Sequence, residues 1–352
     1  MRKRCDENER LKRHYLDWLT DAEGLSVQSI DKVAAALTRF EESTGGKPFR
    51  AFHIDQAKAF KRTLAKAKTM NGRPLATGTI SATVRAVKAF FLWLSQRPGF
   101  RSRISAADCA YFNLSARDEA VAHARRETPF PSMAQALRAF RLMPAETETE
   151  RRNKALFAFL LLTSARVSAV ASLKLRHIDL AEGQVFQDAR EVHTKASKTI
   201  YTTFFPVDDE VRACFEGWVA YLRDVRLFGP SDPLFPKSVA GFDRAGAAAG
   251  TRLARAHWKT TAPIRAIIGE AFEAAGLPRF GPHSFRKTLE QWGATRYVTP
   301  EAFKAFSQNL GHDSVLTTFT SYGQVARARQ AEIIKGPPAP DGPARRYSSV
   351  GD

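Results

Sequence analysis

The stretch "FGPHSFRKTLEQW", residues 280–292, places two side chains suited to phosphate chemistry at the start of an otherwise apolar segment. His283 and Arg286 are one helical turn apart, so both face the same side of a helix. A core helix requires neither residue, whereas a phosphate-binding site uses both. Residues of similar chemistry lie elsewhere in the second half of the chain: Arg166, Lys195, His312 and Tyr322. Each of them alone is more often a solvated or structural residue, so only the whole set carries an argument.

Together, these residue types suit the transfer of a phosphodiester to a tyrosine. A tyrosine oxygen can attack a phosphate and displace a deoxyribose hydroxyl, which stores the energy of the broken bond. Because tyrosine titrates near pH ~10, a base must take its proton or its phenolate must be stabilised. Two guanidinium groups, those of Arg166 and Arg286, suit the negative charge of the transition state. No dense Asp/Glu cluster accompanies them, and we expect neither a metal nor another cofactor.

The order of these residues along the chain resembles the signature of the tyrosine recombinase (phage integrase) family. His312 lies in "LGHDSV" and Tyr322 in "TTFTSYG", after the "HSFRK" motif. The resemblance implies a site-specific recombinase or integrase that cuts and rejoins duplex DNA through a 3′-phosphotyrosyl intermediate at Tyr322. Such an enzyme would serve the integration, excision or resolution of a mobile element.

The resemblance also implies a role for each residue. His283 is the candidate general base near the tyrosine, and His312 donates to a phosphate oxygen. Lys195 is the candidate acid that protonates the leaving 5′-hydroxyl, with Lys198 as its rival. Arg166 and Arg286 clamp the phosphate.

The chain departs from the family's pattern at several positions. Ala169 stands where the family commonly has Glu, and Lys287 stands where it often has His. Tyr322 follows His312 by ten positions, one more than is usual. These departures leave open a catalytically silent DNA-binding regulator with the same fold. A type IB topoisomerase-like relaxing enzyme is the other alternative, while the residues give a metal nuclease no support.

The elements that must position these residues are mainly helical. Apolar residues recur at helical spacing in 27–44 and in 79–96, and the latter has Val84, Val87, Phe91 and Leu94 on one face. The segment 183–207 instead alternates β-branched and aromatic residues around "KASK", which predicts a hairpin or small sheet. Helices are expected to resume from Asp208. We therefore predict a mainly α fold with a small β-sheet.

Four segments are predicted along the chain. Residues 1–112 resemble the family's helical core-binding (SAM-like) domain. Residues 113–131 are polar and end at two prolines, as an interdomain linker does. Residues 132–335 form the α+β catalytic domain, and the Pro/Gly-rich tail 336–352 is predicted to be disordered.

The 352-residue chain has a formal net charge of +18, which predicts a polyanionic partner. The family implies double-stranded DNA with specific recombination sites. It also implies a homo-oligomer, a tetramer on DNA that is a monomer or dimer when free. A charged helix face is in general more often solvated than bound. Given the family, we expect DNA contacts from these residues, with Arg85 and Lys88 favoured: Lys58, Lys61, Arg62, Ser81, Arg85, Lys88, Lys198 and Lys287.

The cellular compartment follows from cysteine usage and hydropathy. The widely spaced Cys5, Cys109 and Cys214 do not form a disulfide framework and fit a reducing compartment. The longest apolar run, "ALFAFLLL", is too short to span a membrane. We expect a cytoplasmic protein without membrane attachment.

Overall fold

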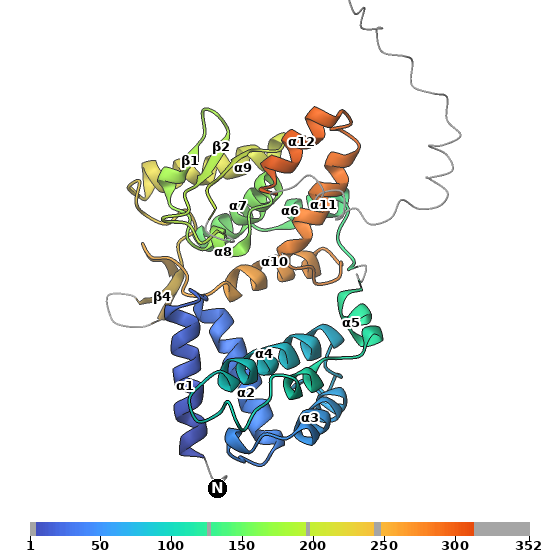
Figure 1. The fold of residues 1–352 in the computed structure, drawn as a ribbon. Helices are drawn as coiled ribbons and strands as arrows, with labels where there is room; N and C mark the ends of the chain where they lie inside the picture. Colours follow the sequence, from blue (N-terminus) through green and yellow to red (C-terminus); the bar gives the residue numbers. More distant parts are fainter. Residues whose placement is uncertain (1–4, 125–127, 195–197, 243–247, 313–352) are drawn as a thin grey trace, which may run out of the picture. The chain divides into compact units, whose positions relative to one another are not determined.

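The computed structural model describes residues 5–124, 128–194, 198–242 and 248–312. The chain divides into two compact units, Met1–Glu127 and Thr128–Asp352 (Figure 1). This division falls within the segment predicted as a linker. The same segment also contains the helix α5 (Ala116–His123), which packs on α4 (Thr77–Ser95) of the first unit.

The first unit is a helical bundle around an aromatic core. Its other helices are α1 (Asp6–Asp21), α2 (Val27–Ser43) and α3 (Ile54–Lys66). The apolar stripe predicted for 79–96 lies on α4, where Val84, Val87, Phe91 and Leu94 are all buried. Phe91 also contacts Phe40 of α2, with ring centroids 5.1 Å apart. The helical periodicity of the sequence therefore identified the faces that form this core.

The second unit is helical with two small antiparallel sheets. Its helices are α6 (Met133–Leu142), α7 (Glu148–Thr163), α8 (Val167–Val170), α9 (Asp209–Ala220), α10 (Ala262–Ala274), α11 (His283–Ala294) and α12 (Pro300–Asn309). In α7 every residue from Ala155 to Thr163 is buried, which explains the uninterrupted apolar run. The mainly α fold with a small sheet is confirmed.

The predicted hairpin is present as part of a three-stranded sheet. Strands β1 (Ile178–Asp179), β2 (Gln184–Gln187) and β3 (Ile200–Thr203) pair in the order β1-β2-β3. Phe186 of β2 lies opposite Tyr201 of β3, and their rings stack.

A second hairpin corrects the expectation that only helices follow Asp208. Strands β4 (Ser238–Phe242) and β5 (Ala248–Leu253) pair with each other. Their alanines and glycines have low β propensity, so the residue pattern does not indicate strands here. Long-range packing determines these strands, since Leu253 is buried in the main core of the unit.

A close helix contact fixes α12 against α11. Gly293 near the end of α11 leaves room for the ring of Phe306 on α12, because an added Cβ would overlap that ring. Phe306 is 2% exposed and packs in a small cluster with Phe205, Leu289 and Trp292. This contact fixes the position of α12 against α11, and therefore the point from which the chain continues to His312.

Substitution of Gly293 by Ala tests this contact. Ala favours a helix over Gly, but here its methyl group would displace Phe306, so we expect a loss of about 1–3 kcal/mol in the free energy of unfolding. Gly217, exposed on α9 with no heavy atom within 4 Å of an added Cβ, is the matched control. Gly217→Ala should stabilise by about 0.5–1 kcal/mol. Denaturant unfolding of both variants measures this, and a stabilising Gly293→Ala would refute the packing argument.

Candidate catalytic site

Arg166 lies where the buried helix α7 ends and the chain turns. Ser164 closes α7 in the left-handed conformation, with φ of 55°, and Arg166 is the residue immediately before the short helix α8. The positive charge of Arg166 contributes to lowering the pKa values of both His283 and Arg286. The turn therefore brings Arg166 close to the start of α11, although these residues are far apart in sequence.

Arg286 is a buried cation of the site, with 6% of its surface exposed. Its Nε donates to His312 Nε2 at 3.2 Å, and its Nη1 donates to the carbonyl oxygen of Ser164 at 3.4 Å. Its Nη2 donates to the carbonyl oxygen of Leu310. Burial, followed by the charge of Arg166, lowers the pKa of Arg286 to about 10. Arg286 therefore stays charged at neutral pH, held by the ends of α7 and α12.

His312 reaches Arg286 through a glycine turn after α12. Gly311 has φ of +67°, a conformation that favours glycine. An added Cβ there would lie 3.0 Å from Cδ1 of Ile200 on β3. The "LGH" motif thus needs its glycine for the turn and for the close approach of β3.

Glu290 is an acidic member of the site that the sequence analysis missed. It is 5% exposed and lies one turn after Arg286 on α11. Its Oε1 is 3.9 Å from Arg286 Nε and 3.7 Å from His312 Nε2. Burial raises the pKa of Glu290 to about 7, against the opposing charges of Arg286 and Lys287. The sequence did contain a signal for it, because Glu290 is an acidic residue on the same helical face as His283 and Arg286.

His283 is the exposed member of the site, at the first residue of α11. Partial desolvation lowers its pKa, and so do the charges of Arg286, Lys287 and Arg166. The imidazole is therefore mainly neutral at neutral pH, as a general base must be.

A hollow beside His283 is lined by two basic residues that the sequence analysis did not single out. They are Arg265 on α10 and Arg279 in the loop before α11, and Val167 of α8 and Phe280 also line the hollow. Arg279 also pairs with Glu273. This hollow adds positive charge next to the candidate base.

The β2–β3 hairpin is fixed to the end of α12 by Asn309. The side-chain amide of Asn309 donates to Thr203 O at 2.8 Å, and its Oδ1 accepts from Thr203 N at 2.7 Å. Thr202 Oγ1 donates to Asn309 O at 3.1 Å. Lys195 lies outside the described residues, and its rival Lys198 is exposed at the start of the β3 segment. Asn309 therefore fixes the strand that leads from both lysines relative to His312.

The segment that leads into the hairpin tip is held at Glu191. This carboxylate accepts hydrogen bonds from Arg176, at Nε 3.0 Å away, and pairs with His177 Nε2 at 2.9 Å. These contacts lower the pKa of Glu191 to about 2. The backbone N–H of His193 further donates to Ser172 Oγ at 2.9 Å. Both sides of the "KASK" segment are thus anchored.

The predicted nucleophile Tyr322 lies outside the described residues. Tyr297, another tyrosine of this region, stacks on Phe306 with centroids 5.0 Å apart and packs edge-on against Trp292. Burial raises the pKa of Tyr297, which disfavours its phenolate. The contacts of Tyr297 are therefore those of a packing residue.

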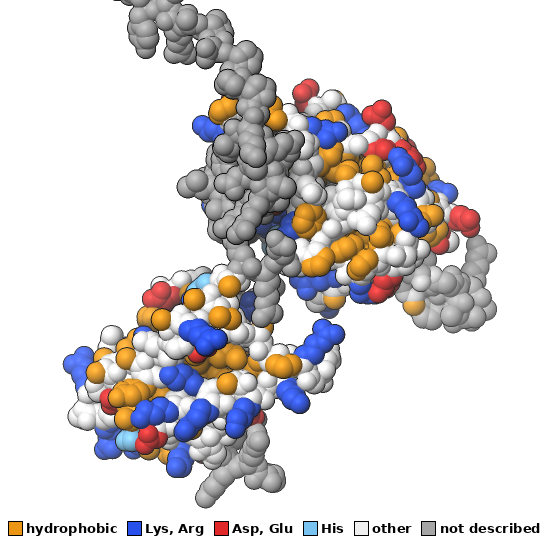
Figure 2. Space-filling model, turned by 90° about the vertical axis from the view of Figure 1, so that its right-hand side faces the viewer, with side chains coloured by type: hydrophobic (Ala, Val, Ile, Leu, Met, Phe, Trp, Pro, Cys, Tyr) orange, Lys and Arg blue, Asp and Glu red, His pale blue; other side chains and the backbone are white. Residues whose placement is uncertain are grey.

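The predicted DNA contacts on α3 and α4 have different surroundings. Arg62 and Arg85 are exposed, and so is Lys58, which lies 5.1 Å from the ring centroid of Tyr111. Lys61 and Lys88 donate to the backbone and side chain of Asn113, respectively. Figure 2 shows one face of this unit on which basic side chains outnumber acidic ones.

Two predicted DNA contacts have partners within the protein. Ser81 is fully buried and donates to Glu119 of α5 at 3.1 Å, a placement at odds with a DNA contact. The polar side of α4 is there covered by α5, which sequence periodicity does not reveal. Lys287 is half-buried, donates to Thr128 O at 3.5 Å and lies 5.9 Å from the ring centroid of Phe130. Lys287 thus holds the segment before α6.

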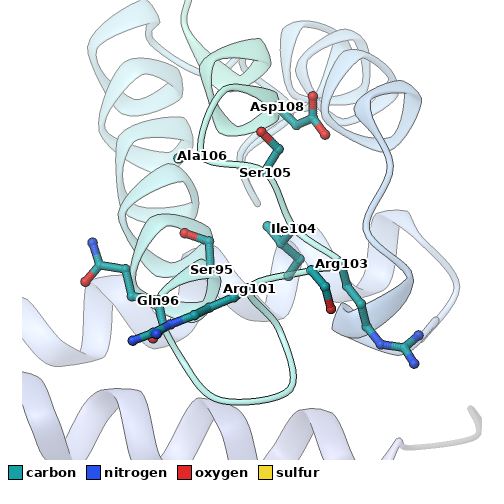
Figure 3. Close-up of a pocket in the computed structure, with 9 residues that line it drawn as sticks. Ser95, Gln96, Arg101, Arg103, Ile104, Ser105, Ala106 and Asp108 are labelled. Atoms are coloured by element: carbon teal, nitrogen blue, oxygen red, sulfur yellow. The ribbon is translucent and has the colours of Figure 1, made fainter.

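A second hollow lies in the first unit (Figure 3). It is formed where the end of α4 meets the following loop, and its lining includes Ser95, Gln96, Arg101, Arg103, Ser105 and Asp108. None of the predicted site residues lines it. Among the described residues, no cluster of His, Cys, Asp and Glu is arranged to hold a metal ion. No described helix is long and apolar enough to cross a membrane.

Solved structures with the same fold are DNA recombinases. A XerH site-specific recombinase bound to its palindromic difH substrate has a TM-score of 0.62 at 15% identity, over 93% of this chain and 84% of that one. A lambda integrase fragment bound to a COC′ core site has a TM-score of 0.60 at 11% identity, over 91% and 96%. The second unit therefore has the fold of tyrosine recombinase catalytic domains.

The sequence comparisons identify the family. The phage integrase family model matches residues 134–329. Tyrosine recombinase XerC of Lactobacillus delbrueckii subsp. bulgaricus is 24% identical over 318 residues, which cover 88% of this chain and 92% of that protein. The chain belongs to the phage integrase family, and it is a tyrosine recombinase.

The raised pKa of Glu290 predicts a pH-dependent stability. A group whose pKa rises on folding, here from 4.5 to about 7, stabilises the fold fully below pH 4.5 and loses that contribution as the pH rises through about 7. Glu290→Gln removes this titration. We expect the variant to gain up to about 3 kcal/mol over the wild type between acidic and mildly alkaline pH. Denaturant unfolding across that range measures it, and a pH-independent difference would contradict the assignment.

Proposed function

We propose that this protein cuts and rejoins duplex DNA at specific sites through a covalent 3′-phosphotyrosyl intermediate at Tyr322. The observation that carries the proposal is the convergence of Arg166, His283, Arg286 and His312. These residues come from the end of α7, the start of α11 and the turn after α12. Such a cluster of cations and a neutral base suits a phosphodiester.

The proposed reaction needs no external energy source. The Tyr322 oxygen attacks the phosphorus as His283 takes its proton, and the bond from phosphorus to the 5′-oxygen breaks. Lys195 gives a proton to that leaving oxygen. The reverse attack by a 5′-hydroxyl of another strand rejoins the DNA and frees the tyrosine.

The arginines act on the charge that develops in the transition state. Each terminal nitrogen of Arg286 carries a second N–H beyond the bonds to Ser164 and Leu310. Those hydrogens and the guanidinium of Arg166 are the proposed donors to the non-bridging oxygens. Preorganised donors of this kind lower barriers by about 2.7–4 kcal/mol each in oxyanion holes.

Double-stranded DNA is the proposed partner. The structural relatives were solved on DNA recombination sites, and this chain carries a net charge of +18. Arg62 and Arg85, exposed on α3 and α4, are suited to backbone contacts. We propose further that the protein assembles as a homo-tetramer on paired sites and works in integration, excision or resolution of a mobile element.

The covalent intermediate provides the decisive test. Wild type, Tyr322→Phe and the control Tyr347→Phe are incubated with nicked duplexes that span the ends of the DNA element carrying the gene. We expect a protein–DNA adduct on a denaturing gel from wild type and Tyr347→Phe, and none from Tyr322→Phe, because Phe lacks the attacking oxygen. Tight binding without any adduct from wild type would favour a DNA-binding regulator. An adduct that persists in Tyr322→Phe would assign the attack to another residue.

A further inference from the structure

Glu290 lies close to two candidate phosphate-binding side chains, those of Arg286 and His312. Its Oε1 lies 3.9 Å from Arg286 Nε and 3.7 Å from His312 Nε2, while Arg286 Nε donates to His312 Nε2 at 3.2 Å. The three groups form a closed triangle whose side chains are at most 8% exposed.

This carboxylate is costly where it lies. Burial disfavours its charge and raises its pKa to about 7, and its charge would oppose an incoming phosphate. An uncharged residue of similar size would avoid both costs. Buried groups that reduce stability are commonly kept where function requires them.

Other charged groups also face this carboxylate. On α11 they are Arg286 and Lys287, which stabilise its ionised form. After α12 it is His312. The charge of Arg166, which follows the end of α7, lowers the pKa of Arg286. Ala169 on α8 is buried and supplies no acidic group from that side.

We propose that Glu290 is a positioning residue whose ionised carboxylate holds Arg286 and His312 in the orientation that meets the scissile phosphate. The inference rests on the proposed function and deepens it. Glu290 does not touch the phosphate and acts through its two partners. Its attraction keeps Arg286 Nε turned toward His312, which leaves the outer N–H groups of Arg286 for the phosphate.

The ratio of wild-type to Glu290→Gln cleavage rates tests the proposal. At about pH 8 the wild-type carboxylate is mainly ionised, and we expect Gln to slow adduct formation on saturating DNA on the order of tenfold. At about pH 6 the wild-type group is mainly protonated, so the ratio should approach one. Because both proteins share His283 and Tyr322, the titration of these residues cancels in the ratio.

Matched measurements separate positioning from folding and from the proposed function. Glu270, exposed on α10, provides the control Glu270→Gln, for which the ratio should stay near one at both pH values. The Glu290→Gln variant should bind DNA as tightly as the wild type. At the higher pH the variant should resist denaturant better than the wild type while forming the adduct more slowly.

A ratio that does not change with pH, or a Glu290→Gln variant as fast as the wild type at about pH 8, would overturn the role of the carboxylate. If the wild type itself forms no adduct with any substrate, the proposed function fails, which is a separate outcome.

Discussion

The enclosure of one guanidinium, that of Arg286, is the constraint on which the second unit depends. A buried cation is tolerated only when acceptors surround it. Its acceptors come from separate elements: the carbonyl oxygen of Ser164 after α7, that of Leu310 after α12, and His312 beyond it. The packing of Phe306 on Gly293 and the bonds of Asn309 to β3 keep these elements at the required distance. A loss at any of these contacts would expose or misdirect the same cation.

The site carries more positive than negative charge, and a bound anion would offset this excess. The charge of Arg166 helps to lower the pKa of Arg286, and the charges of both arginines help to keep His283 neutral. Arg265 and Arg279 add further positive charge beside His283. Glu290 offsets part of this charge from the buried side, at a cost in its own ionisation. A phosphodiester on the open side would complete the neutralisation, which fits a tyrosine recombinase.

Polar residues on helix faces differ in their surroundings: some bind other parts of the protein and others are exposed to solvent. Ser81 and Lys88 lie on the polar side of α4, yet both are used internally, by Glu119 and Asn113. Arg62 and Arg85 remain exposed. Lys287, next to the buried Arg286, holds the backbone at Thr128. Spacing alone does not separate these cases, because the covering segment lies elsewhere in the sequence.

The sequence by itself predicted the family and the local elements. The residue types and order of the whole set predicted the family: Arg166, Lys195, His283, Arg286, His312 and Tyr322. Periodicity predicted α4 and the β2–β3 hairpin. These signals are local, since each depends on neighbours within a few turns or strands. Tertiary structure decided the rest. Glu290 became a partner of His312, Asn309 became the link to β3, and β4 and β5 paired despite weak propensity. Each of these depends on contacts between distant segments, which no local pattern encodes.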